Sequence, residues 1–96
     1  MRQNHAPTTA DEYTDWINRN IGLEVRRRRE ALGLSAYALA HEAGVSDQTL
    51  LNLEQGWLKK GCMSGTLIRI ARRLGLRLSE LVSATEEAAE MPILIG

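Results

Sequence analysis

The chain lacks several features, and each absence excludes a class of protein. Its 96 residues hold one cysteine, Cys62, which rules out an intrachain disulfide and a multi-cysteine metal site within one chain. No apolar run approaches the ~20 residues of a membrane-spanning helix, and the N-terminus has no apolar stretch of a signal peptide. The length suits one modest core and not a typical two-domain enzyme. We therefore expect one cytoplasmic, nucleoid-associated domain with no membrane partner.

The chain also has no net charge, which at first argues against a polyanionic partner such as nucleic acid. The charges are segregated, however, because residues 1–25 sum to −2, residues 26–77 to +6 and residues 78–96 to −4. The local field matters more than the total charge when an anion binds. The pattern predicts a basic domain between acidic flanks, and the alternative is a solvated helical surface with no ligand.

Apolar residues recur at helical spacing, without the alternation typical of strands until the last few residues, which predicts an all-α fold. Thr9 and Glu12 have the spacing of a capping box, which starts a helix. An apolar stripe then runs towards Gly33, and Gly22 within it is expected to break or bend the helix. The stripe consists of Tyr13, Ile17, Ile21, Val25, Arg29 and Leu32.

Serine caps and glycine stops predict three further short helices before residue 76. The caps are Ser35, Ser46 and Ser64, and the glycines that end the helices are Gly44, Gly56 and Gly75. A fifth helix is expected at residues 78–82. Residues 84–96 are expected to form a tail, with a helical extension before Pro92 as the alternative.

Residues 35–54, SAYALAHEAGVSDQTLLNLE, have the spacing of a helix-turn-helix. The turn needs a residue that tolerates positive φ, which Gly44 supplies, and an apolar residue beneath it, which Val45 supplies. Ala40 lies where the two helices cross, and its small side chain permits their close approach. Together, inside a basic helical domain, these features predict a DNA-binding unit.

Residues 22–82 resemble the Cro and lambda-repressor family of DNA-binding domains, the XRE family. The similarity lies in GLEVRRRREALGLSAYALAHEAGVSDQTLLNLEQG and in the closing LIRIARRLGLRLSELV. It implies a five-helix lambda-repressor-like fold and a repressor that binds a palindromic double-stranded operator as a homodimer. We accordingly expect an N-terminal helical extension at residues 1–21, the DNA-binding domain at 22–83 and a C-terminal tail at 84–96.

Arg29 and Glu54 fall on the apolar stripes of their helices, where a lone charge is costly to bury. In the family that the chain resembles, an arginine at the end of the first helix pairs with the glutamate that ends the recognition helix. The resemblance therefore implies a structural ion pair between Arg29 and Glu54.

The outward face of the helix at residues 47–54 is expected to read DNA bases. Glutamine and asparagine can bond an adenine edge, an aspartate can accept from cytosine, and a leucine can contact a thymine methyl group. The expected base-reading residues are Asp47, Gln48, Thr49, Leu51 and Asn52. Asp47 has an equally weighted alternative, because an aspartate at a helix N-terminus is stabilised by the helix dipole.

Affinity is expected to come mainly from phosphate contacts outside this helix face. The expected phosphate-contacting residues are Arg26, Tyr37, Ser46, Gln55, Lys59 and Lys60. Ala36 departs from the family, which often has a glutamine there that braces the recognition helix, so one contact is expected to be missing.

A second class of function is an antitoxin-type module that neutralises a toxin and regulates its own operon. The acidic, partly apolar flanks, residues 1–20 and 84–96, would then hold a basic partner protein, although they serve equally well as dimer contacts. An enzyme is the least favoured class, because the serines are placed as helix caps and neither histidine, His5 or His41, has a catalytic or metal-binding context. No metal or cofactor is expected. Two roles are considered for Trp57: packing on the core or contact with a partner at an interface.

Overall fold

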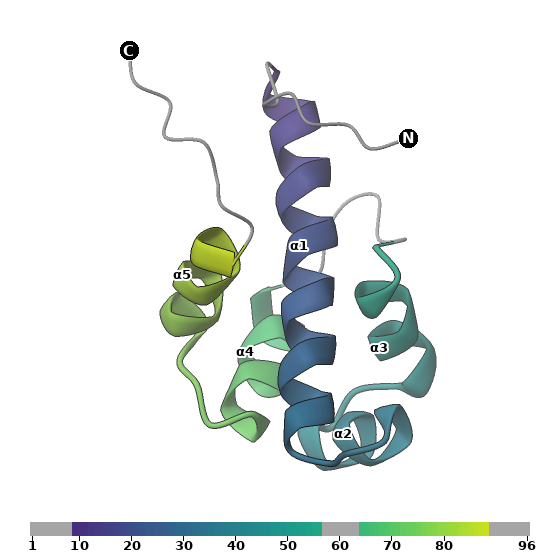
Figure 1. Cartoon of the computed structure of the whole chain (residues 1–96). Helices are drawn as coiled ribbons and strands as arrows, with labels where there is room; N and C mark the ends of the chain where they lie inside the picture. Colours follow the sequence, from purple (N-terminus) through teal and green to yellow (C-terminus); the bar gives the residue numbers. More distant parts are fainter. Residues whose placement is uncertain (1–8, 57–63, 89–96) are drawn as a thin grey trace.

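Five α-helices and no strand make up residues 9–56 and 64–88, the part of the chain that the computed structural model describes. The predicted all-α class is confirmed. The helices are α1 (Ala10–Ala31), α2 (Ala36–Ala43), α3 (Asp47–Glu54), α4 (Ser64–Arg73) and α5 (Leu78–Ala88). α1 runs through the middle of the molecule, with α3 on one side and α5 on the other (Figure 1).

α1 begins at the predicted cap, because the Thr9 hydroxyl accepts a hydrogen bond from the Glu12 N–H at 3.1 Å. The break expected at Gly22 was wrong, since α1 continues through it for 22 residues. Gly22 faces α3 so closely that a Cβ atom there would lie 2.0 Å from the carbonyl oxygen of Leu53. The glycine therefore permits close packing of two helices and does not end one. The domain boundary expected at residues 21–22 lies inside this helix.

The helix-turn-helix is built as the sequence predicts. Gly44 ends α2 with a φ of 77°, and the N–H of Val45 donates to the carbonyl oxygen of Ala40 at 2.9 Å. The Ser46 hydroxyl then accepts from the N–H of Thr49 at 3.1 Å and caps α3. The left-handed conformation of Gly44 and the bond from Val45 to Ala40 turn the chain sharply, so that α3 leaves at an angle to α2.

The other predicted caps differ in detail. The Ser35 hydroxyl accepts from the N–H of Ala38 at 3.0 Å and caps α2 as expected. Ser64 is the first residue of α4 itself, and Gly75 ends that stretch with a φ of 82°.

α5 extends from Leu78 to Ala88, so the alternative of a helical extension before Pro92 is confirmed for residues 84–88 and the helix does not end at residue 82. Leu81 and Thr85 are both buried, one turn apart, and the Thr85 hydroxyl donates to the Leu81 carbonyl at 2.8 Å. Burial of this second turn against the rest of the domain explains why the helix continues into the acidic segment.

The core draws on every helix. The largest fully buried apolar side chains are Val25, Leu39, Leu50, Ile70 and Leu81. Leu32, which the sequence places on the apolar stripe of α1, is instead 54% exposed, because it lies at the C-terminal cap of the helix. One face of α3 thus packs on the core, and the opposite face is open to solvent.

Candidate nucleic-acid interface

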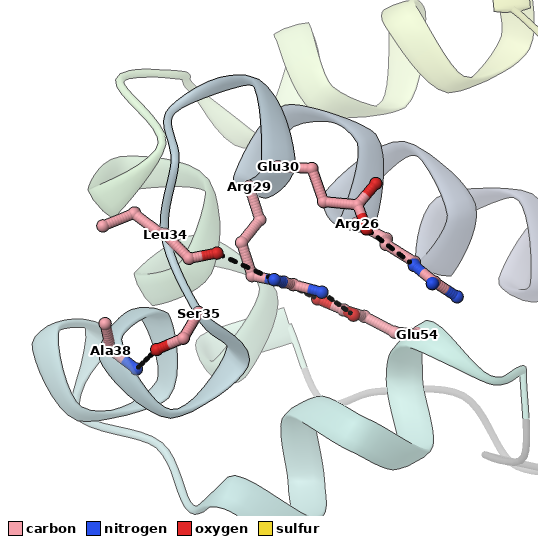
Figure 2. A network of polar contacts seen from close by, with 7 residues as sticks. All are labelled: Arg26, Arg29, Glu30, Leu34, Ser35, Ala38 and Glu54. Atoms are coloured by element: carbon pink, nitrogen blue, oxygen red, sulfur yellow. Dashed lines mark hydrogen bonds and ion pairs between the residues drawn. The ribbon is translucent and has the colours of Figure 1, made fainter.

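The ion pair predicted between Arg29 and Glu54 is present and joins α1 to the end of α3. Arg29 Nε donates to Glu54 Oε2 at 2.8 Å and Nη2 donates to Oε1 at 2.9 Å, while Nη1 donates to the Leu34 carbonyl at 2.8 Å (Figure 2). The two side chains are only 12% and 5% exposed. The bonds to Glu54 raise the pKa of Arg29 above its ordinary value, although burial opposes the shift. This planar, doubly bonded contact fixes the orientation of α3 on α1.

The outward face of α3 carries polar side chains, as the sequence predicts. Asp47, Gln48 and Gln55 are exposed, Leu51 is 38% exposed, and Asn52 is half-buried. The opposite face is buried and consists of Leu50, Leu53 and Glu54. The five outward residues therefore share one surface that can face a ligand.

Two of these outward side chains are bonded to each other. Gln48 Nε2 donates to Asn52 Oδ1 at 2.8 Å, one helical turn along α3. The sequence predicts both residues as base-reading but does not predict this bond. Pairs of polar side chains four residues apart are neighbours on a helix surface, so the spacing permits this bond.

The cap of α3 determines which hydroxyl is available to a ligand. Ser46 Oγ accepts from the Thr49 N–H and donates its own hydrogen to Thr49 Oγ1 at 2.7 Å. A phosphate only accepts hydrogen bonds, so Ser46 cannot donate to one while this bond holds. The Thr49 hydroxyl, which accepts in this pair, keeps its hydrogen for donation.

Tyr37 lies in the first turn of α2 and is 64% exposed. Its ring stacks on His41, with centroids 5.9 Å apart and planes inclined by 10°. The stack holds the ring against the helix, and its hydroxyl can donate to an anionic oxygen.

The run of arginines at residues 26–29 is largely neutralised by nearby carboxylates. Glu24, only 3% exposed, accepts from Arg28 Nε at 2.7 Å and from Arg27 Nε at 3.1 Å. Burial opposes ionisation of Glu24, but the bonds from the two arginines prevail and hold its pKa below the ordinary value. Arg26 contacts Glu30 at 3.2 Å, and both side chains are more than half exposed.

Sequence reasoning did not identify the role of Glu24. The signal was available, because Glu24 stands three and four residues before Arg27 and Arg28, the spacing of helical ion pairs. Among Arg26, Arg27 and Arg28, only Arg26 pairs with an exposed glutamate, Glu30. An exposed ion pair is weak, so Arg26 can leave Glu30 and bind a phosphate.

α4 contributes two arginines that bind back to α2. Arg73 forms an ion pair with Glu42, and Arg69 Nη1 donates to the Gly44 carbonyl at 3.2 Å. These contacts support the turn between α2 and α3 from the side. Among the residues described, no group of three His, Cys, Asp or Glu side chains is placed to hold a metal ion.

Several predicted contacts lie outside the described residues. Lys59 and Lys60 belong to the segment between α3 and α4, as does Trp57, and they stay predictions. The same holds for His5 and for residues 89–96 of the tail. Within the described helices, none combines the length and the apolar character needed to cross a membrane.

Comparisons with known proteins agree with this geometry. A helix-turn-helix family profile matches residues 25–81, more than half of the chain. No curated protein matches the chain. Among solved structures, the chain is similar to the clp gene regulator ClgR from Corynebacterium glutamicum, with a TM-score of 0.67 and 25% identity, covering 78% of this chain and 76% of that one. The chain belongs to the XRE-type helix-turn-helix family.

Proposed function

We propose that the protein is a repressor that binds a palindromic double-stranded DNA operator as a homodimer. Its general role as a DNA-binding transcription regulator follows from its helix-turn-helix family and from its likeness to a clp gene regulator. The observation that carries the finer proposal is the outward face of α3, where amide side chains project from a helix that is locked from behind by the Arg29–Glu54 pair. The proposed place of action is the nucleoid, in the cytoplasm.

The proposed base contacts are made by Gln48 and Asn52, with Asp47, Thr49 and Leu51 beside them. Amide groups match the donor and acceptor pattern of base edges in the major groove, and an apolar side chain matches a thymine methyl group. The absence of a basic residue from α3 is no obstacle, since base contacts specify the sequence while phosphate contacts supply most of the affinity.

The proposed phosphate contacts come from α1, α2, the end of α3 and the segment that follows it. Tyr37 at the start of α2 and Arg26 on α1 are exposed donors, and Gln55 lies at the end of α3. Lys59 and Lys60 are proposed to supply further positive charge, and Ser46 makes no phosphate contact while its hydroxyl donates to Thr49. Two copies would occupy half-sites about one helical turn apart, and the occupied operator would block polymerase sterically.

Binding to the DNA upstream of its own gene, measured over a salt series, tests this function. The wild-type chain should prefer that DNA to a scrambled duplex, and log K should fall linearly with log salt concentration. Gln48→Ala and Asn52→Ala should each weaken the preference and keep the salt slope. Arg26→Ala is the matched contrast, because loss of a phosphate contact should lower the slope by about one and keep the preference. Unchanged sequence preference in both amide variants would refute the assignment of the reading face.

An antitoxin is the second candidate function. The first turns of α1 carry exposed Asp11 and Asp15 beside Tyr13 and Trp16, whose ring centroids lie 6.3 Å apart. An acidic surface with aromatic side chains is suited to a basic partner protein. A toxin-like reading frame beside the gene, whose product co-purifies with the wild-type chain but not with an Asp11→Lys, Asp15→Lys variant, would support this alternative.

A further inference from the structure

The bond between Gln48 and Asn52 limits what each amide can offer to a ligand. Gln48 Nε2 donates to Asn52 Oδ1 at 2.8 Å, and both side chains belong to the outward face of α3. The two residues are four apart, so the bond forms within α3 and needs no other element. No other side-chain hydrogen bond of either residue occurs within the described chain.

Counting donors and acceptors shows that the two amides are no longer equivalent. A free primary amide has one oxygen, which can accept two hydrogen bonds, and two N–H donors. Gln48 uses one N–H in the bond to Asn52, and its oxygen and second N–H stay free. These two groups can accept from N6 of adenine and donate to N7. Asn52 directs its oxygen towards Gln48, and the bond uses one of the two acceptor sites of that oxygen. Both N–H donors of Asn52 stay free, and they point away from Gln48 because the C–N bond of an amide diverges from the C–O bond.

We infer that this bond divides the reading of bases, so that Gln48 recognises adenine and Asn52 recognises a base that presents only acceptors. In the major groove those bases are guanine, through O6 and N7, and thymine, through O4. Cytosine presents an amino donor, which would meet the Asn52 N–H groups unfavourably. The inference deepens the proposed function and presupposes it, because it names the half-site that α3 would select.

The spacing of the two contacts follows from helix geometry. Four residues advance α3 by about 6 Å, and successive base pairs are about 3.4 Å apart. The adenine and the acceptor base should therefore lie one or two base pairs from each other in a half-site.

Selection of binding sites from a library of random duplexes tests the inference. The wild-type chain should select a motif with adenine near a guanine or thymine. Asn52→Asp is the decisive variant, since an aspartate still accepts from Gln48 but has no N–H to donate. The adenine preference should persist, while the neighbouring position should change to a base with an amino group, cytosine or adenine. The change in preference at that position should be roughly fivefold or more.

A second variant tests the coupling itself. Asn52→Ala removes both the donors and the bond, so it should abolish the preference at its own position and also weaken the adenine preference by about twofold. Gln55→Ala is the matched control: it removes an exposed amide that does not bond to Gln48, and it should lower affinity for all sequences without changing the motif. Since these side chains lie on the outer face of α3, the thermal unfolding of all three variants should match that of the wild type.

Each other outcome contradicts the inference in a recognisable way. An Asn52→Asp chain that selects the wild-type motif would show that Asn52 reads no base. An Asn52→Ala chain with an unchanged adenine preference would show that the two amides act independently. Selection of no motif by the wild-type chain would instead overturn the proposed function, and the inference with it.

Discussion

Two buried glutamates, Glu24 and Glu54, each meet the guanidinium groups of arginines from α1. Glu54 bridges two helices through Arg29, whereas Glu24 bonds only within α1, to Arg27 and Arg28. A buried carboxylate without a partner would destabilise the fold. Arg27, Arg28 and Arg29 are therefore needed for stability, whether or not they also contact DNA. At the residue scale, the arginine run is therefore mostly architecture.

Glu54→Ala should lower the free energy of unfolding by about 3 kcal/mol, because the Arg29 guanidinium would stay largely buried without its partner. In a domain of this size the melting temperature should fall by roughly 10 °C or more, with weaker DNA binding as a secondary effect. Thermal unfolding followed by circular dichroism measures the change.

Glu30→Ala is the matched control for this variant, because it also removes a glutamate that contacts an arginine of α1. The Arg26–Glu30 pair is more than half exposed on both sides, so its loss should cost at most about 1 kcal/mol. Equal melting temperatures for Glu54→Ala and Glu30→Ala would contradict the structural role of the buried pair.

Glu24 should make the fold sensitive to acid. Its pKa in the folded chain lies below the ordinary carboxyl value, so the carboxylate stabilises the fold above the unfolded pKa of about 4.3. That stabilisation is lost as the pH falls through the lower, folded pKa. Denaturant unfolding should find the wild type more stable than Glu24→Gln at neutral pH, with the gap closing as the pH falls below about 4. Parallel stability curves for the two proteins would rule this out.

At the scale of elements, the contact between α1 and α3 positions the reading helix. Gly22 brings α1 against the backbone of α3 at Leu53, and the Arg29–Glu54 pair joins the two helices about two turns further along α1. α3 is thus presented to solvent by a rigid neighbour. Positioning of this kind favours recognition, because little order has to be gained on binding.

Gly22→Ala should separate these helices. The added Cβ atom would meet the Leu53 carbonyl oxygen at 2.0 Å, and backbone on both sides cannot yield as a flexible side chain would. Stability should fall by about 2 kcal/mol in denaturant unfolding, even though alanine favours helices. Gly65→Ala, in α4, has no atom within 4 Å of the new Cβ and should leave stability unchanged or slightly raised. A Gly22→Ala chain as stable as Gly65→Ala would contradict the packing role.

Local patterns predicted helix starts well and helix continuity poorly. The caps at Thr9, Ser35 and Ser46 depend on neighbours within three residues, so the sequence carries them completely. Continuity of α1 through Gly22 depends on a contact with α3, which overrides the helix-breaking tendency of glycine. The second turn of α5 likewise depends on burial of Thr85, which no local pattern announces.

The candidate site shows the same division. The outward and inward faces of α3 follow from helical periodicity, and the Arg29–Glu54 pair follows from two charges in apolar stripes together with the family resemblance. The bond between Gln48 and Asn52 depends on side-chain rotamers, and the burial of Glu24 depends on tertiary packing. Both were therefore beyond a reading of residue types, although their spacing permitted them.

At the scale of the whole molecule, a chain of zero net charge holds a basic middle between acidic ends. The three arginines at 27–29 form ion pairs with buried glutamates, and Arg73 forms one with Glu42. The positive charge available to DNA is therefore smaller than the total charge of residues 26–77. We therefore expect binding to depend on salt less steeply than it would if every basic side chain of that segment contacted a phosphate.

A ¹H–¹⁵N NMR titration of the full chain with a duplex selected from the random library tests most directly whether α3 reads DNA. The largest changes should fall on the backbone amides of residues 46–52, on the side-chain amides of Gln48 and Asn52, and on Tyr37. Changes concentrated on α4 and α5, with α3 unaffected, would contradict the account.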